Sequence, residues 1–342
     1  MLTRSTVKRR RSLGLALRLA LTLPVALGAA TFAAHATAQD GAAGYPNRTV
    51  RLVIPYATGA HADLLARTVA QKLSEAWQQQ VVVENRPGGG GTIGTSLGAH
   101  ATPDGYTLLM SALGQLVIYP SMQTNPPYNV LTDFAPVVPL VRTPWVLYTN
   151  KEVPAKDARG LLDYARSRPG GLNGATPGIG TTNHLANALL VKATGIQAES
   201  VHYPGSAQAI QDLIANRTQF MFDSLLSLRF VADGKLNALA VTGAKRSPYA
   251  PELPTMIESG VPDFDVSVWF GLFFPPKTPP AIVDKVNADV RRLMAMKDTQ
   301  DRLSVAKFEY IHDATPVQFS EMIRQDHARW SKVVKDLGLK VQ

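Results

Sequence analysis

The chain has 342 residues, of which 45% are hydrophobic and 18% charged, a composition typical of a globular protein and not of a disordered or fibrous one. It contains no cysteine, which excludes disulfides, thiol nucleophiles and thiolate metal sites. The formal net charge is +9, but six of the 35 basic residues lie in the first 38 positions, which hold no acid. The rest has 29 basic and 26 acidic residues, and this net charge of +3 gives no support to nucleic-acid binding.

The first 38 residues (1–38) have the pattern of an export signal. A basic cluster at 8–11 precedes an apolar run over 13–34 and a small-residue cleavage motif at 36–38. An uncleaved membrane anchor is the alternative, because the run is nearly long enough to span a bilayer, but Arg18 interrupts it. We expect cleavage near Ala38, a mature protein in the periplasm and no further membrane span.

From residue 49 the sequence alternates between strand-like and helix-like segments. Strands are predicted over 49–55, 80–84 and 106–110, and helices over 62–78 and 92–101. After Pro144, strands are predicted near 145–149, 172–176, 199–203, 219–223 and 236–242, and helices near 157–168, 182–194, 206–216 and 225–233. Such alternation, with short connections rich in glycine and proline, predicts parallel sheets covered by helices.

The last part of the chain is predicted to add one strand and two helices. The strand covers 266–274, and the helix starts are marked by Thr278-Pro279 and Thr315-Pro316, a hydroxyl N-cap followed by proline. Trp330 belongs to the apolar stripe of the last helix and is expected to pack in the core.

A mature chain of about 300 residues exceeds what one core usually serves, so two α/β lobes are expected. The connections near 142–146 and 264–268 are extended and are not polar linkers. If the chain passes between the lobes at these two connections, or crossings, the first lobe is discontinuous and consists of residues 45–143 plus 267–342. The second lobe then covers 144–266.

The sequence contains no convincing catalytic motif. The segment 94–98 matches the Gly-x-Ser-x-Gly pattern of serine hydrolases, but the glycines at 88–91 lie too close for a strand to deliver Ser96 to a nucleophile elbow. The same glycine run lacks the Lys-Ser/Thr ending of a P-loop and is interpreted as a turn. No spacing completes a metal site among the histidines outside the signal: His61, His100, His184, His202, His312 and His327. We therefore expect no catalytic residue, no metal and no cofactor.

Three turns between a predicted strand and a predicted helix are rich in small and hydroxyl residues. They cover 55–63, 176–184 and 203–207. Each would direct backbone N–H groups out of a helix N-terminus, where the helix dipole favours an anion. Ligands of open α/β sheets bind outside the carboxyl ends of the strands, where these turns lie. A carboxylate could be held from both lobes without any arginine, although ordinary capped turns would give the same pattern.

Short motifs spread along the whole mature chain carry a family resemblance. They include ENRPG at 84–88, PDGYTLL at 103–109, GTTNHLA at 180–186, YPGS at 203–206, ALAVT at 238–242 and WFGL at 269–272. In this order they resemble the Bug (TctC-type) family, the extracytoplasmic solute receptors of tripartite tricarboxylate transporters.

The resemblance implies a type II-like periplasmic binding protein, in which each lobe is a mostly parallel sheet flanked by helices and the ligand cleft lies between the lobes. It implies that the first and second turns hold a carboxylate through backbone amides and ordered water, and that the lobes close by a hinge motion at the two crossings. The expected ligand-binding residues are Tyr56, Thr58, Gly59, Ala60, His61, Asp63, Gly178, Gly180, Thr181, Thr182, His184, Tyr203, Gly205, Ser206, Asp223 and Trp269.

The first turn departs from the family pattern. The segment 58–60 is Thr-Gly-Ala where the family commonly has Pro-Gly-Gly, which leaves the identity of the ligand open more than its class. Asp63 either accepts a ligand donor or complements the helix dipole, and the second role is slightly favoured. Tyr56 and Trp269 either contact the ligand or only wall the cleft.

The sequence therefore favours a monomeric, non-enzymatic receptor that delivers an organic carboxylate to the permease subunits of a membrane transporter. An exported serine hydrolase using Ser96 is one alternative, and a carboxylate receptor that feeds a sensor kinase is another. Citrate-like, dicarboxylic, amino-acid and aromatic ligands all stay open, because backbone amides recognise the carboxylate and not its substituents.

Overall fold

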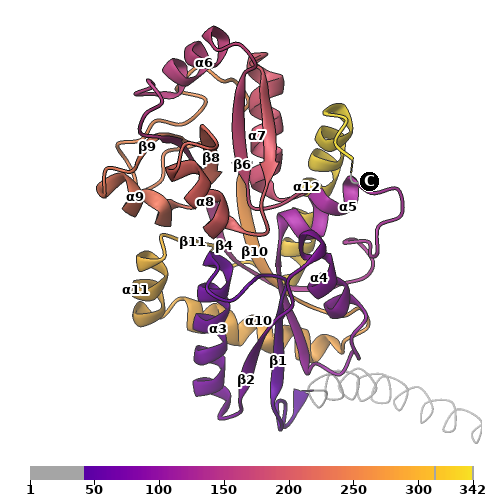
Figure 1. Ribbon diagram of the computed structural model, residues 1–342. Coiled ribbons are helices and arrows are strands. Elements are labelled where there is room, and N and C mark those ends of the chain that lie inside the picture. The colour runs from indigo at the N-terminus through magenta and orange to yellow at the C-terminus, as the bar shows by residue number, and fades with distance from the viewer. Residues whose placement is uncertain (1–41, 312, 341–342) are drawn as a thin grey trace, which may run out of the picture.

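The computed structural model describes residues 42–311 and 313–340. The predicted signal peptide, 1–38, with its cleavage site at Ala38, lies outside the described residues, and so does His312. The described chain forms two sheets, each flanked by helices, which confirms the α/β fold with two sheets (Figure 1). No helix in the described ranges is long and apolar enough to cross a membrane.

The first sheet has six strands in the order β11-β4-β10-β3-β1-β2. Its strands are β1 (Val50–Ile54), β2 (Val81–Asn85), β3 (Thr107–Ala112), β4 (Ala135–Pro144), β10 (Ser267–Phe274) and β11 (Glu309–Tyr310). Its helices are α3 (His61–Trp77), α4 (Thr92–Ala99), α10 (Pro280–Met294), α11 (Lys297–Val305) and α12 (Pro316–Asp336). β1 reads VRLVI, and its last three residues are fully buried, as expected for an inner strand covered on both faces.

Three short helical segments lie in the connections of this unit. The glycine run forms the 3-10 turn η2 (Gly89–Gly91), and β3 is followed by the π-helical turn η3 (Gly114–Ile118) and by α5 (Tyr119–Ser121). The sequence predicted neither η3 nor α5, and it predicted no strand at β4 and no helix at α11. These segments lack a clean helical or alternating pattern, so they depend on their tertiary contacts.

The second sheet has five strands in the order β7-β6-β8-β5-β9. Its strands are β5 (Val146–Asn150), β6 (Leu172–Thr176), β7 (Ala198–His202), β8 (Phe220–Asp223) and β9 (Leu236–Val241). Its helices are α6 (Ala158–Ser167), α7 (Thr182–Thr194), α8 (Ser206–Ile214) and α9 (Leu228–Ala232), the last preceded by the 3-10 turn η4 (Leu225–Ser227). Each predicted strand and helix of this unit is present, with the helix expected over 225–233 divided between η4 and α9.

Both sheets are mixed, which corrects the expectation of mostly parallel sheets. In the first sheet β1 pairs in parallel with β2 and β3, but β10 runs antiparallel to β3 and β4, and β11 antiparallel to β4. In the second sheet β5 runs antiparallel to β8 and β9. The reason is the path of the chain: it leaves the first sheet along β4, enters the second along β5 and returns along β10. A returning strand beside a departing one must be antiparallel.

A single buried threonine joins the two crossings between the sheets. Thr242 Oγ1 accepts a hydrogen bond from Trp145 N (2.9 Å) and donates one to Val266 O (2.5 Å). Its backbone N–H donates to Trp145 O, and its carbonyl accepts from Val266 N, both at 2.9 Å. Because Trp145 follows β4 and Val266 precedes β10, Thr242 holds both connecting segments at one point.

The two predicted helix caps have different outcomes. Thr315 caps α12 as expected, and its side chain and that of Gln318 form a reciprocal capping box. At α10 the expected cap is wrong, because Pro279 occupies the N-cap position and the Thr278 hydroxyl donates instead to Pro275 O (2.9 Å). Trp330 is 3% exposed and belongs to the core, as expected.

Candidate functional site

The three predicted turns each connect a strand to a helix, between β1 and α3, between β6 and α7, and between β7 and α8. They therefore lie at the carboxyl ends of their strands, where α/β proteins bind ligands. The three differ in what their helix N-termini contact.

The first turn contains its own carboxylate. Asp63, 3% exposed, accepts hydrogen bonds from Gly59 N, Arg67 Nε and Asn85 Nδ2, all at 2.9 Å. Burial by itself would raise the pKa of Asp63, but the bonds from Arg67, Gly59 and Asn85 outweigh it and hold the pKa below its usual value. The carboxylate at the start of α3 is thus ionised and uses a backbone N–H of the turn.

The other predicted residues of the first turn differ in their surroundings. Thr58 and Gly59 are exposed and Ala60, the N-cap of α3, is half-buried and offers no side-chain cap. His61 stacks on Phe308 with ring centroids 3.9 Å apart, and its Nε2 lies 2.8 Å from Ala306 O. Since a carbonyl only accepts, Nε2 carries the proton. Burial lowers the pKa of His61 to about 4.

The second turn contains no acidic side chain. Thr181, the N-cap of α7, accepts a bond from His184 N (3.2 Å) and donates one to Gly178 O (2.8 Å). The N–H of Gly180 donates to His184 Nδ1 (3.2 Å). The first residues of α7, Thr182 and Asn183, have backbone N–H groups that no helical partner can satisfy. With the dipole of a 13-residue helix behind them, these groups favour an anion.

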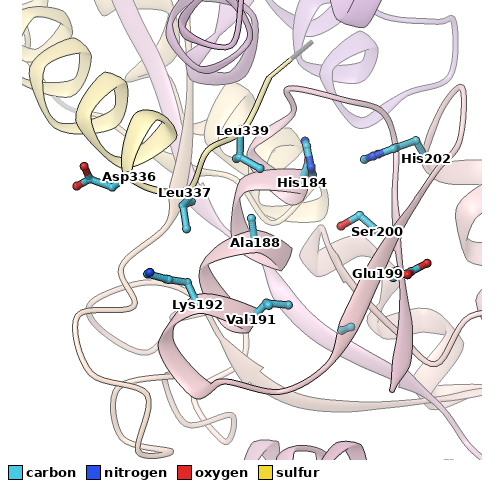
Figure 2. A pocket seen from close by; sticks show the side chains of 11 residues that line it. His184, Ala188, Val191, Lys192, Glu199, Ser200, His202, Asp336, Leu337 and Leu339 are labelled. Atoms are coloured by element: carbon cyan, nitrogen blue, oxygen red, sulfur yellow. The ribbon is translucent and has the colours of Figure 1, made fainter. Parts of the chain in front are cut away.

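His184 turns its ring toward a groove outside the turn. Because Nδ1 accepts from Gly180 N, the proton of the neutral imidazole is on Nε2. His184 and His202 point toward one another, with centroids 4.6 Å apart, at one end of a groove of about 560 Å³ (Figure 2). The groove lies between α7, β7 and the segment after α12, where Leu337 and Leu339 line it. Burial, together with His202, lowers the pKa of His184 to about 4.

The third turn also has a carboxylate of the chain beside it. Ser206, the first residue of α8, donates from Oγ to Asp223 Oδ1 (3.1 Å), and Ser227 donates to the other carboxylate oxygen (2.5 Å). Burial raises the pKa of Asp223, and the two serine hydroxyls oppose the shift. Tyr203 donates to Asp212 (2.8 Å), and Gly205 has an extended backbone with φ 166°.

The two predicted aromatic residues have unlike surroundings. The Tyr56 hydroxyl donates to Gln115 Oε1 (2.6 Å) beside the first turn. Trp269 is fully buried, packs edge-on against Phe319 and donates from its indole nitrogen to Asp326 Oδ2 (2.7 Å). The contacts of Trp269 are therefore those of a core residue, whereas Tyr56 is only partly buried and adjoins the turns.

The segment from Gly114 to Tyr119, which the sequence analysis missed, touches three of the loops at once. A Cβ on Gly114 would lie 3.4 Å from Thr182 N and from Gly180 O, so this residue lies directly against the second turn. Gln115 Nε2 donates to Gly90 O (3.4 Å), while its Oε1 accepts from Tyr56. The sequence carries one signal of this role, because Gln115 is an isolated polar residue in an apolar run, and a buried amide needs partners.

Ser96 lacks the surroundings of a nucleophile. It lies within α4, which follows η2 and not a strand. Its Oγ is 3.4 Å from His100 Nδ1, but that nitrogen is 2.8 Å from the Ser96 carbonyl oxygen. Since the carbonyl can only accept, Nδ1 carries a proton and cannot take one from the hydroxyl. Across residues 42–311 and 313–340, no three His, Cys, Asp or Glu side chains are grouped to hold a metal ion.

Two mixed α/β units joined by two crossings, with strand-to-helix turns at the carboxyl ends of their strands, are the architecture of two-lobed solute-binding proteins. Residues 65–339 match the family described as "Tripartite tricarboxylate transporter family receptor", TctC. The chain belongs to this family, which confirms the resemblance found in its motifs.

Solved structures agree in fold and in sequence. The periplasmic binding protein BugD is 34% identical, with 87% of this chain and 100% of that one covered at a TM-score of 0.80. An R. palustris protein solved with adipate is 34% identical, with 86% and 99% covered and a TM-score of 0.82. MatC from Rhodopseudomonas palustris, solved with malate, is 31% identical, with 85% and 100% covered and a TM-score of 0.79.

Proposed function

We propose that the protein is a periplasmic receptor that captures one small organic carboxylate between two lobes and delivers it to the permease subunits of a tripartite transporter. The lobes are those expected from the sequence, 45–143 plus 267–342 and 144–266. The receptor acts as a monomer and catalyses no reaction.

The observation that carries the proposal is the contrast among the three helix N-termini. The turns before α3 and α8 have Asp63 and Asp223 beside them, whereas the turn before α7 has no acid. An anion brought to α7 would meet the N–H groups of Thr182 and Asn183, beside which this turn places no acidic side chain. Gly114 of the first lobe faces the same position, since a Cβ there would lie 3.4 Å from Thr182 N, so the turn adjoins the other lobe.

The relatives support the ligand class. The R. palustris protein was solved with adipate and MatC with malate, so one family accommodates an unsubstituted and a hydroxylated dicarboxylate. A site built from backbone N–H groups is compatible with both, because it recognises the carboxylate they share. We propose the same class for this chain.

The crossings support movement of one lobe against the other. The contacts of Thr242 fix the two connecting segments to each other, so rotation about this point would move both together. Trp145 Nε1 also donates to Thr182 Oγ1 (3.0 Å), which links the crossing to the first residue of α7. We propose that closure over the carboxylate is a hinge motion at these residues.

A binding screen tests the function. The purified protein is melted alone and with aliphatic, aromatic and amino carboxylates, including adipate and malate. A ligand at 100 times its Kd adds about 2.7 kcal/mol to the free energy of unfolding and raises the melting temperature by several degrees. A shift with one class of acid, confirmed by calorimetry as one ligand per chain, supports the receptor. A flat response, from folded protein free of co-purified ligand, contradicts it.

Two further readouts separate the alternatives. Ester turnover that is lost in Ser96→Ala would favour a hydrolase, and the receptor predicts no turnover in either protein. A deletion strain that loses uptake of the acid supports delivery to a permease. A strain that keeps uptake but loses a transcriptional response to the acid would assign the receptor to a sensor kinase.

A further inference from the structure

We propose that Tyr119 is the residue that seals the two lobes together at the ligand-binding turn, and that its ring, not its hydroxyl, sets how tightly the carboxylate is held. This inference rests on the proposed function. It assigns a role to a residue outside the predicted turns, in a segment that the sequence left without a structure.

The ring lies between one glycine from each lobe. A Cβ built on Gly90, in η2 of the first lobe, or on Gly180, in the turn before α7 of the second, would overlap the ring of Tyr119. The same Cβ on Gly90 would lie 3.1 Å from Ile179 O. The two turns are therefore in contact beside the ring. Both glycines also have positive φ, 65° and 73°. These positions therefore require glycine for the turn and for the contact with the ring.

The ring is held in this place by the helix that precedes it. Tyr119 begins α5, which continues directly from η3, and η3 also carries Gly114 and Gln115. The η3 turn packs against α12 and α4, so its base is fixed in the first lobe. Tyr119 is 8% exposed and stands on that base, with its edge against the Gly180 backbone of the second lobe. Separating the lobes would uncover this edge.

The contact affects the anion site through water. Thr182 N, a proposed donor to the carboxylate, lies two residues from Gly180 and faces Gly114. A ring packed on Gly180 keeps solvent away from this side of the turn. Hydrogen bonds to a charged oxygen are stronger where water is excluded, so a sealed turn holds the carboxylate more tightly.

The hydroxyl has no part in this mechanism. Within the described residues, Tyr119 Oη makes no hydrogen bond, unlike Tyr56 and Tyr128, whose hydroxyls donate to the side-chain and backbone oxygens of Gln115. Tyr119→Phe is therefore the matched control, since it keeps the ring and removes only the hydroxyl. Tyr119→Ala removes the seal, and Tyr119→Leu keeps apolar bulk without the flat edge.

The first measurement needs no ligand. The chain has no cysteine, so one cysteine can be introduced in each lobe and spin-labelled. The positions are Val305, at the end of α11 in the first lobe, and Asp233, just after α9 in the second. Both side chains are exposed. We expect Tyr119→Ala to lengthen and broaden the distance distribution between the labels, and Tyr119→Phe to match the parent. An unchanged distribution in Tyr119→Ala overturns the inference, whether or not the protein binds a carboxylate.

The second measurement is calorimetric titration with adipate and malate. We expect Tyr119→Ala to bind about tenfold or more weakly, as truncation of a buried aromatic at an interface does, and Tyr119→Phe to stay within about twofold. Equal losses in both variants would assign the effect to the hydroxyl and overturn the inference. If the parent binds no acid at all, the proposed function fails, and the label distances still decide the role of Tyr119.

Folding is checked by circular dichroism and thermal melting. If the variant melts near the temperature of the parent and the distance between the labels still increases, the effect is a loss of the seal and not a general loss of stability. If Tyr119→Ala does not fold, Tyr119→Leu takes its place. We then expect a longer distance between the labels and weaker binding than in Tyr119→Phe. No difference between the Leu and Phe variants overturns the inference.

Discussion

The turn before α3 and the turn before α7 are built alike, but they present opposite surroundings to an anion. Both follow a strand with parallel neighbours, both contain proline and small residues, and both lead into a long helix. In the first, Asp63 accepts from Gly59 N, Arg67 and Asn85. In the second, Thr181 caps the helix and no acid is present.

The difference teaches that a helix N-terminus attracts an external anion only where the protein has not already supplied one. A carboxylate at α3 would add to the charge of Asp63, whereas at α7 it would meet donors alone. The contacts of Asp63 are those of an acid that shapes its own turn, and a bond from Asp63 to a ligand donor stays a prediction.

The largest expected effect comes from a methyl group in the second turn. Gly180→Ala would place its Cβ into the Tyr119 ring at a positive φ of 73°, so we expect carboxylate affinity to fall by about tenfold or more. Gly205→Ala is the matched control in the third turn, because φ is 166° there and nothing lies within 4 Å of the new Cβ. Calorimetric titration of both checks this, and equal affinities would break the comparison.

The next effect separates stability from binding in the first turn. Asp63→Asn leaves Arg67 without its buried partner, so we expect the free energy of unfolding to fall by about 1–3 kcal/mol. We expect affinity for the carboxylate to change by less than about threefold, because the three hydrogen bonds that Asp63 accepts come from Gly59, Arg67 and Asn85 of the chain itself. Urea denaturation and titration measure the two separately. A loss of affinity without a loss of stability would move Asp63 into the binding site.

Both turns contain a histidine whose pKa is lowered to about 4, His61 in the first and His184 in the second. Such a histidine is neutral in the folded protein, while the unfolded chain binds a proton below about pH 6.5. Stability therefore falls as the pH drops from 6.5 toward 4, by on the order of 1–2 kcal/mol for each histidine between pH 7 and 5.

The variant His61→Phe isolates one of these contributions. Phenylalanine keeps the stack on Phe308 and cannot be protonated. The difference in unfolding free energy between pH 7 and 5 should therefore be smaller in the variant than in the parent, by the contribution of one histidine. Denaturant melts of the parent and the variant at both pH values give this difference directly. An undiminished dependence on pH would mean that His61 is charged or solvated in the folded state.

The smallest effect compares the threonines of the two turns. Thr181→Ala removes the N-cap of α7, which should cost about 1 kcal/mol of stability. The exposed Thr58 makes no hydrogen bond within the described residues, so Thr58→Ala should stay within about 0.5 kcal/mol of the parent. Thermal melting compares the two variants, and similar losses would show that the first turn is capped in solution as well.

Much of the local structure could be predicted because it follows from short-range chemistry. The VRLVI strand, the Thr315 cap with Gln318 and the hydroxyl-rich turn before α7 each depend on residues within a few positions of one another. Apolar periodicity and capping are visible in such windows. The order of the short motifs from ENRPG at 84–88 to WFGL at 269–272 was also enough to identify the family.

The sequence could not give the direction of β10 or the structure of the segment from Gly114 to Tyr119. Strand direction follows from the path of the chain through both sheets, and the η3 turn lies in an apolar run with no clear period. The roles of the acids were equally hidden. Asp223 meets Ser206 from 17 positions away, and Asn85 meets Asp63 from 22.

The sequence by itself determined most of the strands and helices, that three turns would place helix N-termini at the strand ends, and that the family is one of carboxylate receptors. Only the tertiary structure decided which of these N-termini have a carboxylate of the chain beside them and which ring lies against the turn before α7. The physical reason is that periodicity and caps act between neighbours in the chain, whereas the field at a helix end depends on every charged group near it in space.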